Sequence, residues 1–245
     1  MHNLVVDQGN TRLKYATFMR GKLQTQGVID VPKAGDILAL ATNHAVQNII
    51  FSTVSTTPTP EEAKALADAF RYYELSATTP LPIRNSYRTP DTLGKDRLAA
   101  VVGAYALYPG QTCLVIDAGT CMTLDVLTDT GEYLGGNISP GVRMRYRAMH
   151  QFTARLPLVA PGSWQLDWGV DTHTALENGG LLGAALEMEA WVARLRSQWP
   201  HLQTLLTGGD AALLAKRLKC KIFVHPNLVL YGLDKILTYN VKQLA

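Results

Sequence analysis

The chain has 245 residues, of which 47% are hydrophobic and 18% are charged, and its formal net charge is +3. This length predicts one large domain or two small ones, and the hydrophobic content argues against a disordered chain. The basic residues form no block, which argues against nucleic-acid binding, and no apolar stretch reaches the roughly 20 residues of a membrane helix. With three scattered cysteines and no secretory signal, we expect a cytoplasmic protein without disulfides or structural zinc.

The first thirty residues predict three consecutive antiparallel strands. A short apolar run at 4–6 stops at the turn-forming sequence Asp7-Gln8-Gly9-Asn10-Thr11. Alternating residues follow at 13–17, and a turn at Arg20-Gly21 leads to a third strand at 23–29. Up to residue 110 the pattern further predicts a strand at 48–53 and helices at 32–44, 60–73 and 93–108, the last capped by Thr92.

The same order of elements restarts at residue 113. An apolar run at 113–116 ends at Asp117-Ala118-Gly119-Thr120, and a hairpin and a third strand follow up to residue 138. The two Asp-x-Gly turns lie 110 residues apart, which predicts two copies of one supersecondary unit. The other expected elements are helices at 142–155, 172–198, 211–216 and 228–239 and strands at 203–206 and 221–224. We therefore expect two α/β halves, 1–110 and 111–245, with a ligand cleft between them.

The first Asp-x-Gly turn carries groups that suit a phosphate and its cation. Asp7 can hold a hydrated magnesium ion, and Gly9 lets an anion come close to the backbone. Further donors and positive charge come from Asn10, Thr11 and Lys14. Taken alone, this turn is explained equally well as a hairpin with an Asx cap.

Two further turns favour the phosphate hypothesis. In the second Asp-x-Gly turn, Asp117 offers a carboxylate for a cation and Thr120 a hydroxyl for phosphate. A third backbone-accessible turn, Thr207-Gly208-Gly209, also follows an expected buried strand. The chain has neither a P-loop motif nor a Rossmann glycine motif, so phosphate binding is expected to use these hairpin turns.

Gly94-Lys95-Asp96-Arg97 is the candidate acceptor site. A carboxylate beside a guanidinium at a helix start can orient a substrate hydroxyl and hold an anionic substrate. The alternative is a first-turn acid that favours the helix dipole, with a surface arginine. Tyr87 is either a pocket wall or a strand aromatic, and Thr172 either a helix cap or a substrate donor.

Other conspicuous residues favour structural roles. The segment 135–141 is too rich in glycine for a central strand and indicates close backbone approach before a helix. Cys121 is expected to be a small buried residue, and no histidine has metal-ligand spacing. A solvated basic face is the favoured explanation for most of Arg143, Arg145, Arg147 and Arg155.

In this order and spacing, the motifs resemble the type III pantothenate kinases of the acetate kinase, sugar kinase, Hsp70 and actin superfamily. The resemblance covers nearly the whole chain and rests on six blocks, which are D-x-G-N-T-x-x-K at 7–14, T-L-G-K-D-R at 92–97, I-D-A-G-T at 116–120, G-G-N-I-S-P-G at 135–141, A-R-L-P at 154–157 and T-G-G at 207–209. It implies two RNase H-like (actin-like ATPase) domains, each with a mixed five-stranded sheet and flanking helices, and an ATP cleft between them. It also implies a homodimer.

The resemblance further implies ATP-dependent phosphorylation of pantothenate, the first step of coenzyme A synthesis, with Mg²⁺ and an activating potassium or ammonium ion. Asp96 resembles the proton acceptor and Asp117 the ligand of the monovalent cation. The positions that resemble ATP contacts are Asp7, Gln8, Gly9, Asn10, Thr11, Arg12, Leu13, Lys14 and Thr120. Those that resemble pantothenate contacts are Tyr87, Gly94, Lys95, Asp96, Arg97 and Thr172. One departure is Asp171, where the family usually has Asn before this threonine.

Two alternatives remain beside this interpretation. One is a nucleotide-binding regulatory protein of the same fold, of the accessory transcription factor type, without kinase turnover. The intact 94–97 segment and both acidic turns argue against it. The other is a kinase that acts on a different small hydroxy acid.

Overall fold

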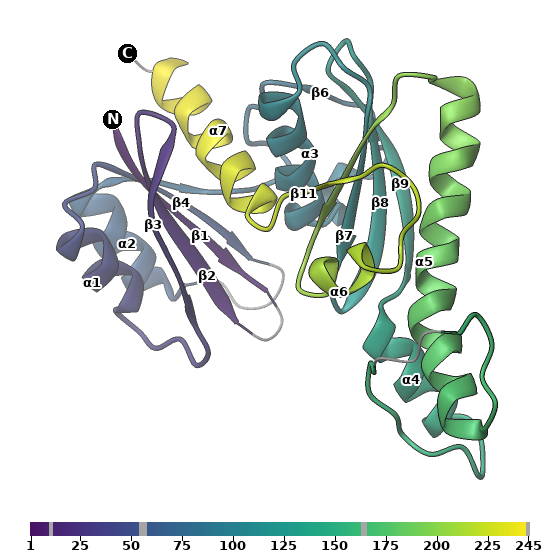
Figure 1. The fold of residues 1–245 in the computed structure, drawn as a ribbon. Coiled ribbons are helices and arrows are strands. Elements are labelled where there is room, and N and C mark those ends of the chain that lie inside the picture. The colour runs from purple at the N-terminus through teal and green to yellow at the C-terminus, as the bar shows by residue number, and fades with distance from the viewer. Residues whose placement is uncertain (10–11, 54–57, 163–165, 244–245) are drawn as a thin grey trace. The chain divides into compact units, whose positions relative to one another are not determined.

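A computed structural model describes residues 1–9, 12–53, 58–162 and 166–243 of the chain (Figure 1). The chain divides into two compact units. Unit 1 contains residues 1–109, 131–133 and 227–245, and unit 2 contains residues 110–130 and 134–226. The expected ranges 1–110 and 111–245 differ from this division mainly in the C-terminal helix, which packs within unit 1. Among the described residues, no helix is both long and apolar enough to cross a membrane.

Unit 1 is built on a mixed sheet of five strands in the order β3-β2-β1-β4-β5. β1 is antiparallel to β2 and parallel to β4, so it lies in the middle of the sheet. Its run Leu4-Val5-Val6 is completely buried because helices cover both faces of a central strand. The strands are β1 (His2–Gln8), β2 (Leu13–Met19), β3 (Lys22–Ile29), β4 (Asn48–Thr53) and β5 (Arg71–Glu74).

Two helices cover each face of this sheet. On one face, Leu4, Val6 and Phe51 pack in a core with α1 (Asp36–Asn43) and α2 (Pro60–Ala69). The start of α2 is fixed by a capping box between Thr59 and Glu62 and by a proline at its first position. On the opposite face, α3 (Lys95–Leu107) and α7 (Leu228–Gln243) pack against Val5 and Ile50. Figure 1 shows α7 on the side of the sheet opposite to α1 and α2.

Two glycines allow α3 and α7 to come close together. A Cβ at Gly232 would lie 1.7 Å from the carbonyl oxygen of Ala99, and one at Gly103 would lie 2.5 Å from that of Leu228. Only residues without a side chain fit where the two helix backbones touch. This close packing explains why the last helix of the chain belongs to unit 1.

Unit 2 repeats the topology of unit 1. Five strands of the second sheet follow the order β9-β8-β7-β10-β11, which matches β3-β2-β1-β4-β5 element by element. This sheet has six strands and not the expected five, because a short sixth strand pairs with β9. As in unit 1, the first strand pairs antiparallel with the second and parallel with the fourth. The strands are β7 (Cys113–Ala118), β8 (Cys121–Leu127), β9 (Glu132–Pro140), β10 (Gln203–Thr207) and β11 (Phe223–Val224). The predicted duplication of one supersecondary unit is therefore confirmed.

The helices of unit 2 pack around a single apolar core. They are α4 (Val142–Gln151), α5 (Thr172–Gln198) and α6 (Ala211–Ala215). Their buried residues meet Leu114, Ile116 and Leu206 of the sheet. Arg145 joins α4 to α5 through an ion pair with Glu187 and also donates to the Pro140 carbonyl oxygen, so this arginine is structural and is not part of a solvated face.

Three local predictions are wrong. The segment 60–73 is not one helix, because α2 ends at Ala69 and β5 follows at once. Thr92 does not cap α3; it ends a 3₁₀ turn, Pro90–Thr92, and Gly94 occupies the cap position. The glycine-rich segment 135–141 lies largely in strand β9, with β8 on one side and the short strand β6 (Arg84–Asn85) on the other. Gly136 nevertheless marks a close approach, because a Cβ there would lie 1.9 Å from the Leu124 carbonyl oxygen.

Candidate functional site

Three polar side chains of unit 1 lie on the same face of its sheet, at the end of β1. The register pairs Asp7 with Lys14 on β2 and with Ser52 on β4. Side chains alternate between the two faces of a strand, so Asp7 and Ser52 share the face of Val5 and Ile50, which α3 and α7 cover. The fold therefore places the Asp7 carboxylate on the sheet face against which α3 packs.

Asp96 lies in the first turn of α3. The Arg97 backbone N–H donates to the Asp96 carboxylate at 2.8 Å and holds it near the helix start. Gly94 leaves room for this carboxylate, since a Cβ at Gly94 would lie 2.5 Å from Asp96 Oδ1. The predicted Gly94-Lys95-Asp96-Arg97 segment thus forms a local structure in which the acidic side chain is oriented by its neighbours.

The two carboxylates of unit 1 influence each other. The pKa of Asp7 is raised to about 6, chiefly because burial disfavours its charged form and additionally because of the negative charge of Asp96. The positive charge of Lys14 acts in the opposite direction, and the neighbouring Ser52 hydroxyl adds to that effect. Asp7 is therefore a carboxylate whose ionisation a nearby cation would favour strongly.

Arg97 is a buried cation beside two stacked aromatic rings. Only 5% of Arg97 is exposed, and its guanidinium carbon lies 5.5 Å from the centre of the Tyr87 ring. Tyr87 also neighbours Tyr133, whose ring is stacked on it at 6.1 Å with an angle of 6° between the planes. Both geometries are favourable for a guanidinium over a ring and for an aromatic pair.

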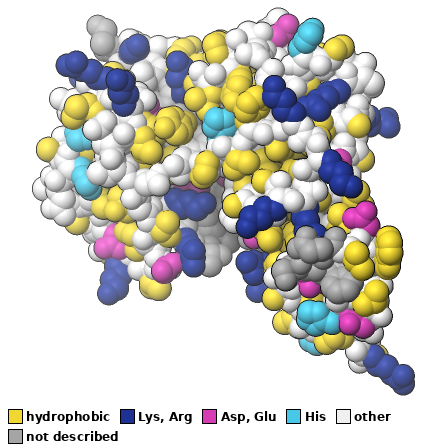
Figure 2. Space-filling model, viewed as in Figure 1, with side chains coloured by type: hydrophobic (Ala, Val, Ile, Leu, Met, Phe, Trp, Pro, Cys, Tyr) yellow, Lys and Arg dark blue, Asp and Glu magenta, His cyan; other side chains and the backbone are white. Residues whose placement is uncertain are grey.

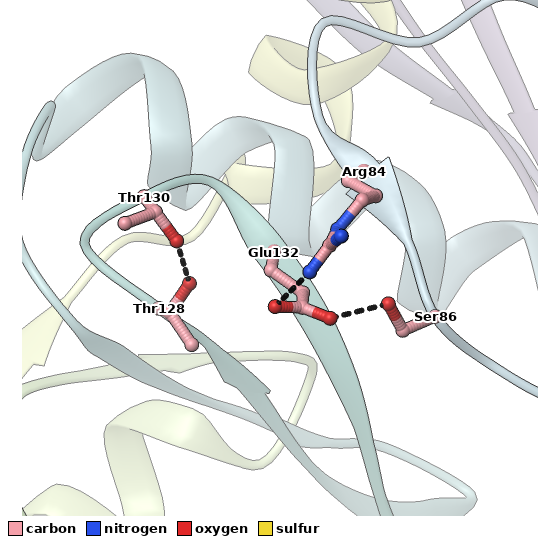
Figure 3. A network of polar contacts seen from close by, with 5 residues as sticks. All are labelled: Arg84, Ser86, Thr128, Thr130 and Glu132. Carbon is pink, nitrogen blue, oxygen red and sulfur yellow. Dashed lines mark hydrogen bonds and ion pairs between the residues drawn. The ribbon is translucent and has the colours of Figure 1, made fainter.

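The backbone of Tyr87 is held in place by the pairing of β6 with the first residues of β9. Arg84 pairs with Glu132, and Asn85 pairs with Tyr133. The Glu132 carboxylate accepts a hydrogen bond from the Ser86 hydroxyl at 2.6 Å and forms an ion pair with Arg84 at 2.5 Å (Figure 3). These two contacts lower the pKa of Glu132, the Ser86 hydrogen bond first. The Asn85 side chain in turn accepts a hydrogen bond from the Tyr87 backbone N–H at 3.0 Å.

The other predicted residues of unit 1 have varied surroundings. Gln8 and Gly9 lie at the end of β1, whereas Asn10 and Thr11 fall outside the described residues. Arg12 is exposed and forms an ion pair with Asp30 at 2.8 Å. Leu13 is 1% exposed and packs in the core on the other face of the sheet, away from Asp7. Lys14 on β2 is the register partner of Asp7. Lys95 directly precedes Asp96 in the sequence.

In unit 2, the second and third predicted turns come together. Asp117 lies near the end of β7, and Gly208, at a φ of +96°, follows β10. A Cβ on Gly208 would lie 2.4 Å from the Ala118 carbonyl oxygen and 2.5 Å from Asp117 Oδ1. The start of α4 joins this group, because the Gly141 N–H donates to the Thr120 carbonyl oxygen at 3.2 Å. Thr120 itself is exposed.

Asp210 is a residue of this group that the sequence reasoning did not single out. It follows Thr207-Gly208-Gly209 directly, and burial raises its pKa. Arg143 lies 3.8 Å from it and partly counteracts that effect. The sequence signal that could have identified Asp210 is its position as the first acidic residue after the third turn.

The structure separates the two roles considered for Thr172. Asp171, not Thr172, caps α5, because its carboxylate accepts a hydrogen bond from the Thr174 backbone N–H at 2.8 Å. That hydrogen bond lowers the pKa of Asp171. Thr172 is exposed in the first turn of α5 and takes no part in the capping box. An aspartate caps a helix as well as an asparagine does, so Asp171 can replace the asparagine that the family usually has at this position.

A separate cavity of about 320 Å³ lies in unit 1 between the sheet and helices α1 and α2. Its lining is mostly apolar and includes Leu13, Phe51 and Leu66. It opens on the face of the sheet opposite to Asp7 and Ser52. Among the predicted site residues that the structure describes, only Gln8 and Leu13 line this cavity.

Comparison with known proteins connects these residues to one family. A sequence model of type III pantothenate kinases matches residues 3–194. A type III pantothenate kinase from Bacteroides fragilis is 42% identical over 239 residues, which cover 97% of this chain and 98% of the relative. Those from Phocaeicola vulgatus and Porphyromonas gingivalis are each 40% identical, with 98% of this chain and 99% of each relative covered.

Solved structures show the same fold at low identity. A conserved Campylobacter jejuni protein assigned to the Baf family of transcriptional activators has a TM-score of 0.61 at 21% identity and covers 98% of this chain and 99% of its own. An activator of 2-hydroxyisocaproyl-CoA dehydratase from Clostridium difficile, solved with ADPNP, has a TM-score of 0.55 at 13% identity, with 100% and 97% covered. A ROK hexokinase from Thermus thermophilus has a TM-score of 0.52 at 13% identity, with 98% and 100% covered. These likenesses concern the fold alone.

Proposed function

Because the chain belongs to the type III pantothenate kinase family, we propose that it transfers the γ-phosphoryl group of ATP to the primary hydroxyl of pantothenate, the first step of coenzyme A synthesis. The observation that carries this proposal is the match to curated pantothenate kinases over nearly the full length of the chain. The oriented Asp96 carboxylate beside the buried Arg97 cation supports it independently.

Asp96 is the proposed proton acceptor for the attacking hydroxyl. Its carboxylate is oriented by the Arg97 N–H, which leaves its remaining lone pairs for a substrate hydroxyl. The Arg97 guanidinium and Tyr87 ring supply a cation and an apolar wall for an acceptor that carries a carboxylate. Gly94, Lys95 and Thr172 complete the proposed pantothenate contacts. Phosphoryl transfer requires chiefly positioning and charge neutralisation, which such groups provide.

ATP and its divalent cation are proposed to use the end of β1. The proposed ATP contacts are the residues of 7–14 and Thr120. Asp7 fits a divalent cation such as Mg²⁺, because its oxygens are hard ligands and its carboxylate lies in a negative, buried environment. When bound, the cation neutralises charge on the phosphates. In the described part of the chain, no cluster of three or more metal-ligating side chains occurs, which fits a cation held by one or two carboxylates and by the nucleotide.

A monovalent cation is proposed at Asp117. The carboxylate of Asp117 lies at the end of β7, where Gly208 leaves space that any side chain would fill. Carbonyl oxygens of the adjoining turns and a carboxylate suit potassium or ammonium. This cation is a prediction from the family resemblance. A cytoplasmic location is proposed from the three scattered cysteines.

We also propose a homodimer. Large apolar side chains are exposed on unit 2, including Phe152 at 80%, Trp168 at 66% and Ile138 at 62%. Figure 2 shows hydrophobic side chains at the surface around α4, together with Lys and Arg side chains at several separate places. A concentration of exposed apolar residues on one unit favours contact with a second copy.

The decisive experiment measures ADP release with pantothenate, with an analogue that lacks the primary hydroxyl, and with other hydroxy acids. We expect release only with pantothenate, and faster release in potassium or ammonium than in sodium at equal ionic strength. Asp117→Asn is expected to remove the difference between potassium and sodium.

Each proposal has its own contradicting result. ATP binding without ADP release for any acceptor would favour the regulatory protein, and release with another hydroxy acid but not pantothenate would change the substrate. Equal rates in all cations would remove the monovalent site while leaving the kinase function intact.

A further inference from the structure

Tyr133 is the completely buried member of a stack that ends at Arg97. Its exposed fraction is 0%, and its ring lies nearly parallel to that of Tyr87. The Tyr87 ring in turn lies 5.5 Å from the guanidinium carbon of Arg97. Tyr133 is absent from the motifs that suggested a substrate site. Its ring is nevertheless the rigid support against which the partly buried Tyr87 rests.

The backbone on both sides of this stack is fixed by hydrogen bonds. The Ser86 N–H donates to the Tyr133 carbonyl oxygen at 3.0 Å, and the Arg84 N–H donates to that of Gly131 at 2.9 Å. The Glu132 carboxylate adds its contacts with Ser86 and Arg84 (Figure 3). The two tyrosines therefore cannot slide past each other without loss of the β6–β9 pairing.

We propose that Tyr133 is a positioning residue of the substrate site, which holds Tyr87 and through it Arg97 in the geometry that receives the acceptor. This inference rests on the proposed function. An arginine side chain has many rotamers, and a ring packed against its guanidinium restricts it to few. The stack therefore reduces the side-chain entropy that Arg97 would otherwise lose when the substrate binds. The Ser86–Glu132–Arg84 contacts keep the stack in register.

The test compares Tyr133→Leu with Tyr133→Phe in the full-length enzyme. Loss of the aromatic pair is expected to raise the KM for pantothenate by roughly three- to tenfold. The KM for ATP should change less than twofold, because the stack is not part of the proposed nucleotide contacts. Tyr133→Phe keeps the ring and should retain both constants within about twofold.

A matched control distinguishes positioning from stability. Phe18 is also completely buried in unit 1 and makes an edge-to-face contact with Tyr231 at 5.2 Å, at the opposite end of β2 from Lys14. Phe18→Leu should lower the melting temperature, as Tyr133→Leu does, without raising the KM for pantothenate. In a Tyr87→Leu background, Tyr133→Leu should have no further effect, because the two rings act as one unit.

An unchanged KM in folded Tyr133→Leu, an equal rise for ATP, or full additivity with Tyr87→Leu would overturn the inference. If Tyr133→Leu does not fold, Ser86→Ala removes one surface hydrogen bond of the register contacts, and an unchanged KM for pantothenate there overturns it too. Absence of pantothenate-dependent ADP release by the wild type would remove the proposed function and this inference together. An active wild type with unaffected variants removes the inference alone.

Discussion

At the scale of single residues, Asp96 and Asp7 illustrate how position decides the role of a carboxylate. Asp96 is oriented by a local backbone hydrogen bond in the first turn of α3. Asp7 lies on a sheet face that helices cover, where burial and the Asp96 charge oppose its ionisation. The first is suited to accept a proton and the second to meet a cation.

Asp96→Asn is expected to remove the proton acceptor and keep the shape of the side chain. We predict that kcat falls by roughly a hundredfold or more, whereas the Kd for ATP changes less than threefold. Steady-state kinetics and nucleotide titration measure the two effects. A variant with near wild-type turnover would show that Asp96 is not the base.

The raised pKa of Asp7 predicts that the stability of the protein depends on pH. Because its pKa is raised to about 6 in the folded protein, the folded state holds this proton to a higher pH than the unfolded state does. The contribution of Asp7 to the free energy of unfolding therefore falls as the pH rises from about 4 to about 6. Above that range, Asp7→Asn should be more stable than the wild type by about 2 kcal/mol, after allowance for partial access of water.

Denaturation at pH 4 and pH 7.5, without nucleotide or divalent cation, tests this prediction. Asp30→Asn is the control, since Asp30 is exposed at the surface and its ion pair with Arg12 should contribute little to stability. The same advantage of Asp7→Asn at both pH values would contradict a raised pKa. The variant is expected to be a poor kinase, which would make the wild-type carboxylate a functional feature that costs stability.

At the scale of elements, the close contact between α3 and α7 is expected to be sensitive to substitution. The same two helices cover the sheet face that carries Asp7, and α3 begins at the Asp96 turn. The glycine crossing at Gly103 and Gly232 thus affects the site residues through the position of α3.

Gly232→Ala is expected to force the two helices apart. The new methyl group would meet the Ala99 carbonyl oxygen, a backbone atom that cannot rotate away, and we predict a loss of about 1–3 kcal/mol in the free energy of unfolding. Gly183→Ala is the matched control, because its nearest neighbour within α5 would lie 3.9 Å away. There the alanine should stabilise by up to about 1 kcal/mol. Equal effects of the two substitutions would contradict the tight crossing.

At the scale of the whole molecule, the internal repeat accounts for the placement of the two acidic turns. Asp7 and Asp117 occupy the same position in their units, at the end of the first strand and before the hairpin. The surroundings of the two residues differ, because Asp7 faces a helix pair, whereas Asp117 lies against a glycine turn. Equivalent positions thus support different proposed ligands, a divalent and a monovalent cation.

The proposed homodimer predicts an effect of surface substitutions on assembly. Phe152→Ser and Ile138→Ser should each weaken self-association at least roughly tenfold, because they remove exposed apolar area from unit 2. Val31→Ser in unit 1 is the control, since Val31 is 74% exposed outside the proposed contact surface. Analytical ultracentrifugation over a range of concentrations measures the effect. A monomeric wild type would contradict the proposal.

Periodicity and turn residues determined most of the elements and their order. Strand β4 and helix α5 lie where the sequence predicted them, because β4 is a continuous buried run and α5 begins at a capping box. The 110-residue spacing of the acidic turns also predicted the duplicated topology, since chemically similar segments in the same order fold into similar units. Short strands such as β5 and β6 were missed, because two to four residues carry too little pattern to distinguish them from a helix end or a loop.

Tertiary structure alone decided which of the singled-out residues meet. The pairing of Tyr87 with Tyr133, the return of α7 to unit 1, and the junction of the Asp117 and Gly208 turns all join segments far apart in the chain. Local sequence determines local conformation through dihedral preferences, hydrogen bonds and apolar periodicity. Contacts between distant segments depend on strand register and on how closely two backbones can pack. Neither of these can be read from the sequence of one chain.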